Sequence, residues 1–417
     1  MLIPPPSPIS LEFDHADEQA LTDLVERFAK TEIAPFVSQW DAAGEFPRLL
    51  YKRAADLGLL GMGYPESLGG TPASYRMRNV VSLALARYGA SGGVCASLFS
   101  HSIGLPIIIR YGSLDLQRAV VPPVLAGDKI SALAITEPGG GSDVAALKTT
   151  AVRDGTDYVI NGEKTFITSG MRADFLTTAV RMSDGAAHSA EMNAARGVSI
   201  GAARGAAAIS MIVIPADLPG VSGTRLDKMG WLCSDTAHIR FDNVRVPAHF
   251  LVGQEGAGFK MIMANFNGER LGMAVLALGF AQACFDEALD WARERKTFGQ
   301  LLTEHQVIRH KLVDMQMRIC STQAWVDALT LRADTGDESA GGAVTARWVA
   351  EVCLLKNHAT QTMQFCADAA VQILGGMGFM RGTKSERIYR EVKVMMIGGG
   401  AEEIMKELAA RQLGLQA

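Results

Sequence analysis

Hydrophobic residues recur every three or four positions through most of the first 130 residues. Between about residues 11 and 44, Leu21, Leu24 and Phe28 follow this spacing, with charged residues between them. The spacing places apolar side chains on one face of a helix. Pro35 is expected to kink or restart that helix. Further helices are predicted over about residues 47–57, 74–88, 94–111 and 115–125.

Short β-like runs replace the helical spacing between about residues 131 and 247. These runs are Ala151-Val152, Tyr158–Ile160, Lys164–Thr168, Phe175–Val180, Met211–Ile214, His238–Phe241 and Val244–Val246. Asp154-Gly155 and Asn161-Gly162 are typical of two-residue hairpin turns. A small antiparallel β-domain is therefore predicted. Inside it, Ser183 to Ser210 is rich in Ala and Gly, which indicates a passive loop or, alternatively, a mobile flap.

Helical spacing returns near Gly256 and continues to the end of the chain. The apolar stripes are Leu271, Val275, Leu278, Phe285 and Leu289, then Ile308, Leu312, Met315, Ile319, Val326 and Leu329. A third helix is predicted over about 344–374 and a fourth from near Glu402. Four such helices form a bundle. We therefore predict an α+β multidomain chain: an N-terminal all-α domain (1–130), a middle antiparallel β-domain (131–247) and a C-terminal four-helix bundle (248–417).

Composition fits a folded protein with a large core. The chain has 417 residues, of which 48% are hydrophobic and 20% charged, and its formal net charge is -4. This charge argues against nucleic acid or an anionic membrane surface as the main partner. No uninterrupted apolar run reaches about 18 residues, so no membrane span is predicted. The Pro-rich residues 1–10 match neither a secretory signal nor a transit peptide. A cytoplasmic location is predicted, although a processed organellar chain would look the same.

Cysteine and histidine spacing predicts no metal site. The six cysteines are Cys95, Cys233, Cys284, Cys320, Cys353 and Cys366, with no Cys-x-x-Cys pair among them. Buried free thiols in a reducing compartment are the expected state. The eight histidines lack His-x-x-x-His and His-Glu-x-x-His spacing, so zinc is not expected.

A glycine-rich loop, Thr136 to Asp143, follows the apolar run Ile130 to Ile135. Successive glycines let backbone N–H groups approach a ligand closely, and the hydroxyls of Thr136 and Ser142 flank the turn. The loop lacks the Gly-Lys-Ser/Thr of a Walker loop and the helix that should follow a dinucleotide fingerprint. By itself the pattern fits a tight structural turn and a loop for a flat, phosphate-bearing ligand equally well.

Three separated stretches give the chain a family resemblance. They are Thr136 to Ala151; Gly230-Trp231 with Phe241 to Phe259; and Arg295 to Gly299 with Gln306 and Gln372 to Phe379. Together, and in this order, they closely resemble the acyl-CoA dehydrogenase family of flavoproteins over roughly residues 12 to 414. The family fold is a helical domain, a β-domain and a helical bundle, which agrees with the pattern above.

The resemblance implies FAD as the cofactor. Thr136 would bond the flavin ring, Ser142 would lie near the FAD pyrophosphate and the substrate, and Phe166 would cover the isoalloxazine. Thr168 would donate to flavin N5, where a donor stabilises the charge that develops after hydride transfer. The remaining implied FAD contacts are Gly141, Ile167, Arg295, Phe298, Gln306, Gln372, Gly375, Gly376 and Glu403. Arg295, Phe298, Gln306, Gln372, Gly375 and Gly376 match positions that grip the ADP half of a neighbouring subunit's FAD, which implies a homotetramer built as a dimer of dimers.

The catalytic base departs from the commonest family pattern. Many members carry it in Glu-Gly-Thr near the C-terminus, where this chain has Gly399 and, at the Thr position, Ala401. Isovaleryl-CoA and long-chain acyl-CoA dehydrogenases carry it in Glu-Arg-Leu, which matches Glu269-Arg270-Leu271. Glu269 is therefore the predicted base, and Arg270 resembles a substrate-side position. Glu402 and Glu403 are rival bases, although acidic residues also suit a helix N-terminus, and a dead enzyme is the other alternative.

The predicted reaction is α,β-dehydrogenation of an acyl-CoA to the trans-2-enoyl-CoA, with electrons passed to an electron-transfer flavoprotein. In the family the backbone N–H at the Gly399 position bonds the thioester carbonyl, and glycine retains that donor. Its missing side chain leaves room for a branched, bulky or longer acyl group. Alternatives are an acyl-CoA oxidase, a dehydrogenase of carrier-protein-bound acyl groups, and a non-catalytic assembly protein on the same fold.

Overall fold

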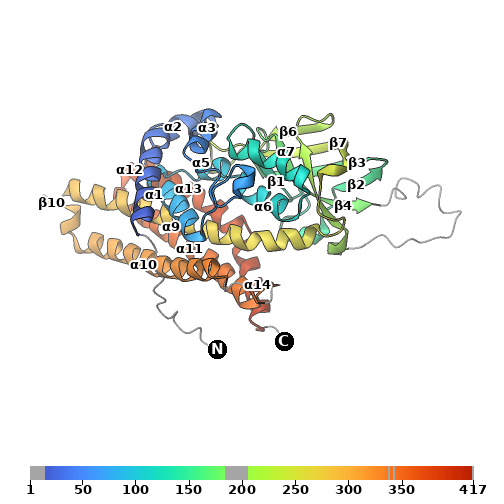
Figure 1. Ribbon diagram of the computed structural model, residues 1–417. Coiled ribbons are helices and arrows are strands. Elements are labelled where there is room, and N and C mark those ends of the chain that lie inside the picture. Colours follow the sequence, from blue (N-terminus) through green and yellow to red (C-terminus); the bar gives the residue numbers. More distant parts are fainter. Residues whose placement is uncertain (1–14, 184–204, 337–338, 341–342, 416–417) are drawn as a thin grey trace. The chain divides into compact units, whose positions relative to one another are not determined.

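The computed structural model describes residues 15–183, 205–336, 339–340 and 343–415. Along these residues helices come first, strands follow, and long helices return (Figure 1), which confirms the predicted fold class. Most of the segment Ser183 to Ser210, predicted to be a loop or flap, lies outside the described residues. Contacts divide the chain into two compact units. The helical unit comprises Met1–Ser38, Ala73–Cys95 and Arg270–Ala417, and the sheet unit comprises Gln39–Pro72 and Ala96–Glu269.

Long helices dominate the helical unit. Its main elements are α1 (His15–Phe28), α4 (Tyr75–Ala84), the part of α9 (Gly258–Glu294) from residue 270 onward, α10 (Gln306–Asp334), α11 (Ala346–Leu374), α12 (Gly376–Phe379), α13 (Lys384–Ile397) and α14 (Glu402–Gln412). Helix α11 packs against α10, α13 and α14. Hydroxyl caps fix two starts, because Thr345 accepts from the Trp348 N–H at α11 and Thr383 from the Glu386 N–H at α13.

The N-terminal helices follow the predicted pattern with two interruptions. Helix α1 loosens into a π-helical turn, Ala29–Ile33, and α2 (Val37–Ala43) begins beyond Pro35, so the predicted interruption at Pro35 is confirmed. The other helices of this region are α3 (Leu49–Asp56), α5 (Gly92–Leu98), α6 (His101–Tyr111) and α7 (Leu114–Leu125). The single helix predicted over 94–111 is thus two helices, α5 and α6.

Within the described residues, the sheet unit contains one eight-stranded sheet, which Figure 1 shows beside α6 and α7. Its strands are β1 (Ser131–Ala134), β2 (Thr150–Asp154), β3 (Asp157–Thr168), β4 (Phe175–Ser183), β5 (Ile209–Pro215), β6 (Val221–Arg225), β7 (Thr236–Pro247) and β8 (Leu251–Val252). The order is β6-β7-β3-β2-β4-β5-β8, with β1 beside β4. Strand β4 runs parallel to β1 and β2, so the sheet is mixed rather than wholly antiparallel as predicted.

The two predicted hairpin turns have different outcomes. A turn does form between β2 and β3, but its two residues are Gly155 and Thr156, one position later than the predicted Asp154-Gly155, because Asp154 ends β2 and pairs with Asp157. Asn161-Gly162 is not a turn, because it lies inside β3 at a shift of register against β7. Gly162 has φ of 142°, and a Cβ on it would lie 2.6 Å from the Thr149 Cα. This close approach explains a glycine inside a continuing strand.

Among the described residues, two apolar clusters contain side chains of the sheet. One includes α6 and α7 residues such as Leu105, Ile108 and Val120 with Met211 of β5. The other includes Tyr158, Ile160 and Phe241 with their neighbours. The stretches Gly92–Tyr111 and Gly258–Glu294 are apolar enough to cross a membrane by length and composition alone, but 67% and 61% of their most apolar windows are buried. Packing inside the protein accounts for that composition, and the absence of a span stays a prediction.

Five of the six cysteines are buried free thiols, as predicted. The exception is Cys320, an exposed residue of α10, for which the expectation of burial is wrong. Burial raises the pKa of Cys95 and of Cys366 to about 12. These two thiols are therefore protonated at neutral pH and unreactive.

Candidate functional site

The glycine-rich loop is a tight turn that follows β1. The Gly140 N–H donates to the Glu137 carbonyl at 3.0 Å, and the Glu137 N–H donates back to the Gly140 carbonyl at 3.4 Å. Residues 138–143, including Gly141 and Ser142, are exposed, and Thr136 is half-buried. The loop is thus a structural turn that also presents its glycines and Ser142 to solvent, so both alternatives from the sequence remain compatible with it.

A buried ion pair anchors this turn. Lys164 of β3 donates to a Glu137 carboxylate oxygen at 2.8 Å and to the Ile135 carbonyl at 3.0 Å. The Lys164 side chain is 0% exposed and that of Glu137 8%. The same carboxylate accepts from the Lys148 N–H at 2.6 Å and from the N–H and hydroxyl of Thr149 at 2.9 and 2.7 Å. Glu137 therefore ties the loop to β3 through Lys164 and to the residues directly before β2 through Lys148 and Thr149.

Both members of the pair are charged at pH 7. Burial lowers the pKa of Lys164 to about 8, because desolvation of the ammonium outweighs the hydrogen bond and charge of Glu137. Burial acts to raise the pKa of Glu137, but the hydrogen bond and charge of Lys164 and the hydrogen bonds of Thr149 bring it below its ordinary value. The loop is thus tied down by a charged, nearly dry contact.

Phe166 stands out on the strand that supplies Lys164. Its side chain is 70% exposed and its φ is 60°, a conformation that a bulky residue rarely adopts. The register of β3 against β7 shifts between Lys164 and Ile167 at this place. Ile167 is buried and Thr168 half-buried. A strained, exposed aromatic side chain suits stacking on a flat ring, and backbone strain of this kind is typical of functional sites.

A second strained aromatic residue lies in the helical unit. Strands β9 (Lys296–Thr297) and β10 (Gln300–Leu301) form a hairpin directly after Arg295. Its central residues, Phe298 and Gly299, have φ of 52° and 84°, as a type I′ turn requires. Phe298 is 99% exposed, although asparagine or glycine would fit this conformation better. The turn therefore displays an aromatic ring to solvent at a conformational cost.

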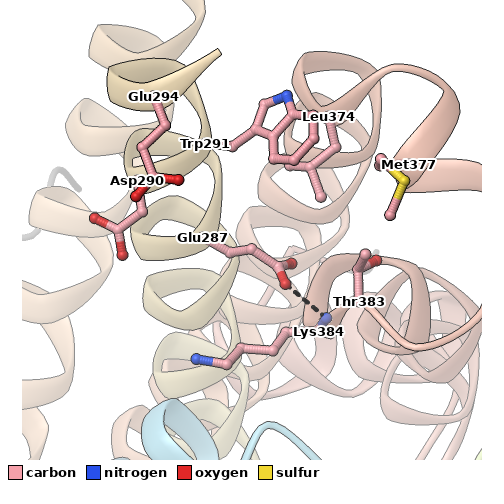
Figure 2. Close-up of a pocket in the computed structure, with 8 residues that line it drawn as sticks. All are labelled: Glu287, Asp290, Trp291, Glu294, Leu374, Met377, Thr383 and Lys384. Carbon is pink, nitrogen blue, oxygen red and sulfur yellow. Dashed lines mark hydrogen bonds between the residues drawn. The ribbon is translucent and has the colours of Figure 1, made fainter.

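A pocket of about 320 Å³ lies between two of the predicted FAD-binding segments (Figure 2). It is lined by Glu287, Asp290, Trp291, Glu294, Leu374, Met377, Thr383 and Lys384. Its α9 side ends one residue before Arg295, and its other side flanks Gly375-Gly376. The structure thus brings the two segments together within the helical unit.

The pocket itself does not suit a diphosphate. Three of its lining residues, Glu287, Asp290 and Glu294, carry carboxylates. Glu287 accepts from the backbone N–H groups of Lys384 and Ser385 at 2.9 and 2.7 Å, at the start of α13. Its charge therefore stabilises a helix N-terminus. An FAD diphosphate would meet like charge in this pocket, so a contact with the diphosphate is expected at the exposed Arg295, directly after Glu294, rather than inside the pocket.

The three glycines Gly398 to Gly400 join α13 to α14. Arg270, at 5% exposure, donates from Nε to the Gly399 carbonyl at 3.0 Å. Lys356 donates to the Met396 and Gly400 carbonyls at 3.0 and 2.8 Å. Several hydrogen bonds from buried side chains therefore hold the predicted thioester-binding loop.

The candidate bases have different surroundings. Glu269 is half-buried and is the last residue of the sheet unit, directly before Arg270. Glu402 accepts from Lys406 at 2.6 Å and from Gln361 at 2.7 Å, and the Lys406 hydrogen bond lowers its pKa. A paired carboxylate with a lowered pKa is a poor base at neutral pH. Glu403 is exposed.

The residues present fit FAD. Phe166 and Phe298, two strained and exposed aromatic residues, occupy positions that the family resemblance assigns to this cofactor. The contacts assigned to a neighbouring subunit's FAD are all exposed, as a shared site requires: Arg295, Phe298, Gln306, Gln372, Gly375 and Gly376. When bound, FAD supplies a hydride acceptor.

Sequence reasoning missed four residues of this region. Lys164 and Glu137 form the buried pair, and Lys356 and Asn357 hold the chain around the glycine loop, with Asn357 donating to the Glu402 carbonyl at 2.9 Å. One available signal was a lysine that directly follows apolar residues in a long helix, as Lys356 follows Leu354 and Leu355. The partners of the two lysines could not be identified from spacing, because they lie 27 to 44 positions away.

Comparison with known proteins identifies the fold. Three family models match: the acyl-CoA dehydrogenase N-terminal domain at residues 15–128, the middle domain at 132–244 and the C-terminal domain at 256–414. The rat mitochondrial long-chain specific acyl-CoA dehydrogenase is 34% identical over 400 residues, which cover 95% of this chain and 86% of the relative.

Two further proteins are similar over nearly the whole chain. The human mitochondrial short-chain specific acyl-CoA dehydrogenase is 34% identical over 396 residues, covering 95% of this chain and 89% of the relative. The crystal structure of a probable acyl-CoA dehydrogenase from Mycobacterium abscessus has a TM-score of 0.88 at 44% identity, covering 96% of this chain and 100% of that one. The chain therefore belongs to the acyl-CoA dehydrogenase family and is an FAD-dependent oxidoreductase.

Proposed function

We propose that this chain dehydrogenates an acyl-CoA thioester at its α and β carbons, with Glu269 as the base that removes the α-proton. The hydrogen bond from Arg270 to the Gly399 carbonyl, at 3.0 Å, is the main support. In the family, the backbone N–H at the Gly399 position bonds the thioester carbonyl. Arg270, which directly follows Glu269 in the chain, thus contacts the loop that is proposed to bind the thioester carbonyl.

The residues proposed to act at the substrate divide the work. Gly399 donates its N–H to the thioester carbonyl, which makes the α-proton more acidic, and Glu269 accepts that proton. Thr136 and Thr168 would hold the flavin ring of FAD and Phe166 would cover it, and the bound flavin would supply the acceptor for the β-hydride. Ser142 lies near the substrate and the FAD pyrophosphate, and Gly141 and Ile167 complete the contacts of that loop and strand.

The rival bases have weaker support. Gly399 carries no carboxylate at the commonest family position, and Glu402 is engaged by Lys406 and Gln361. Glu403 is exposed and is kept as a cofactor contact. Glu269, the first residue of the Glu-Arg-Leu motif, is therefore the favoured candidate for the base.

The acyl group is proposed to be branched, bulky or longer than a plain short chain. Gly399 removes a side chain beside the thioester, which leaves volume for such a group. The names of the relatives do not indicate the length of the acyl group, because a long-chain specific and a short-chain specific enzyme have the same sequence identity to this protein.

An electron-transfer flavoprotein is the proposed acceptor, and a homotetramer the proposed assembly. The exposure of Arg295, Phe298, Gln306 and Gln372 supports a site completed by a neighbouring subunit's FAD. The three-domain division at residues 130 and 247 and a cytoplasmic location are part of the same proposal.

Anaerobic titration tests the reaction. Straight short, medium and long acyl-CoAs, isovaleryl-CoA and citronellyl-CoA are added while the flavin absorbance is followed. Bleaching by the branched or longer members supports the proposed substrate class, whereas bleaching by butyryl-CoA and hexanoyl-CoA alone contradicts it. Peroxide formation in air would indicate an oxidase, and bound FAD without any bleaching would favour a carrier-bound substrate or a non-catalytic relative.

A pair of variants tests the base. Glu269→Gln is expected to retain FAD and to slow bleaching by roughly 10²–10⁴-fold, the usual contribution of a general base. Glu402→Gln removes a carboxylate from the rival position and is expected to bleach at the wild-type rate. The reverse result would transfer the role to Glu402.

A further inference from the structure

Lys356 is a buried charge in the middle of a long helix. It belongs to α11, and its side chain is 0% exposed. Burying an ammonium costs several kcal/mol unless hydrogen bonds replace the lost water. Its Nζ donates to the Met396 carbonyl at 3.0 Å and to the Gly400 carbonyl at 2.8 Å. Burial of a lysine at such a cost indicates that the contacts of its ammonium group have a specific role in the fold or in the site.

The two carbonyls bracket the glycine loop. Met396 lies in the last turn of α13, where carbonyl groups lack helical partners, and a lysine can satisfy such an orphan. Gly400 lies just before α14. Lys356 therefore grips the chain on both sides of Gly398-Gly399.

The loop needs such external support. Gly399 has φ of 66° and Gly400 has φ of 113°. Three successive glycines have no side chains with which to restrict their own backbone, and glycine loses the most conformational freedom on folding. Hydrogen bonds from other elements can restrict this backbone and so fix the direction of the Gly399 N–H.

Arg270 completes the support from another helix. It donates from α9 to the Gly399 carbonyl at 3.0 Å, between the two carbonyls that Lys356 holds. Three carbonyls within five residues thus accept from two buried cations. Both cations lie close to the peptide groups of the loop, where positive charge stabilises negative charge on a bound oxygen.

We propose that Lys356 is a positioning residue that fixes the Gly399 N–H toward the thioester carbonyl and strengthens it as an oxyanion donor. This inference rests on the proposed function of Gly399. Lys356 does not contact the substrate, and it acts through the backbone of the loop. Its loss should therefore weaken what depends on the thioester oxygen and leave the rest of CoA binding unchanged.

Two ligands of equal chain length separate these effects. The trans-2-enoyl-CoA product carries the thioester carbonyl, whereas the corresponding S-alkyl-CoA thioether replaces it with a methylene. Dissociation constants for both are measured on the FAD-loaded protein from the perturbation of the flavin spectrum. Lys356→Met keeps the length of the side chain and removes the charge and its donors.

Lys356→Met is expected to weaken enoyl-CoA binding by about tenfold or more, since loss of one oxyanion donor has effects of about 10²–10³-fold. Binding of the thioether should stay within about twofold of the wild type. Lys406→Met, which removes a lysine that pairs with Glu402 on α14 but does not contact the glycine loop, is the matched control and should change neither constant. Lys356→Gln, which keeps neutral donors, should fall between Lys356→Met and the wild type.

Equal weakening of both ligands, or of neither, would overturn the proposal. If neither Lys356 variant accumulates as a folded flavoprotein, the lysine is structural and the proposal also fails. A wild-type protein that is not bleached by any acyl-CoA would instead overturn the proposed function, so the two failures are distinguishable.

Discussion

The buried pair Lys164–Glu137 allows a quantitative prediction. Lys164→Met leaves the Glu137 carboxylate with the N–H of Lys148 and the N–H and hydroxyl of Thr149. Breaking a buried pair costs about 3–5 kcal/mol. Because these three hydrogen bonds remain, we expect a loss near the lower limit, about 3 kcal/mol in the free energy of unfolding.

The opposite change should cost more. Glu137→Leu leaves the Lys164 ammonium with the Ile135 carbonyl and also removes the acceptor for the loop, so we expect about 5 kcal/mol. Contacting residues couple by about 0.5–3 kcal/mol. The double variant should therefore cost about 0.5–3 kcal/mol less than the sum of the single changes.

Equilibrium urea unfolding followed by far-UV circular dichroism measures these losses. FAD is kept at one saturating concentration, and its measured dissociation constant corrects for ligand stabilisation. Lys129→Met is the control, because Lys129 pairs with Asp174 at 2.9 Å while 48% exposed and such a pair contributes at most about 1 kcal/mol. If Lys164→Met costs no more than Lys129→Met, or if the double variant is additive, the assignment of stability to this pair is wrong.

Three further predictions concern single positions. Burial lowers the pKa of His101 from 6.5 to about 4, so on acidification the unfolded chain takes up this proton before the folded chain does. The free energy of unfolding therefore has its full value above pH 6.5 and falls by roughly 3 kcal/mol as the pH approaches 4. His101→Phe should flatten that part of a plot of the free energy of urea unfolding against pH. On α9, Gly272→Ala should raise stability by up to about 1 kcal/mol because no atom lies within 4 Å of its added Cβ, whereas Gly279→Ala should lower it because the Cβ would lie 2.7 Å from atoms of Leu83 and Ala86; thermal melts of the two variants compare them directly. Gly162→Ala should destabilise by roughly 1–3 kcal/mol at φ of 142°, and a urea midpoint equal to the wild type would contradict the strain argument.

Local signals made much of the fold predictable. The signal at Asp154-Gly155 locates a turn to within one residue, at Gly155-Thr156, because the conformation of a two-residue turn depends mainly on its own residues. Asn161-Gly162 carries the same signal, yet contact with Thr149 and continued pairing with β7 place it inside a strand. The sequence pattern was sufficient where neighbours decide the conformation and insufficient where distant residues do.

The site shows the same limit. Motif resemblance identified Phe166 and Phe298, but not the left-handed backbone of either residue, which depends on the register of β3 and on a hairpin turn. Lys164 and Lys356 are of a residue type that usually lies on the protein surface. Their burial depends on Glu137 and on the carbonyls of the glycine loop, which are distant in the sequence and become neighbours only in the folded protein.

The distribution of exposed and buried thiols allows folding and assembly to be followed on the native chain by cysteine labelling. Cys320 is exposed on α10, and the other five cysteines are buried. A maleimide dye or spin label should therefore attach to one position per native chain and to all six after unfolding. Association through α10 would slow the labelling of Cys320 without changing the final count. The unmodified protein thus offers separate readouts of folding and of assembly, with no cysteine to add or remove.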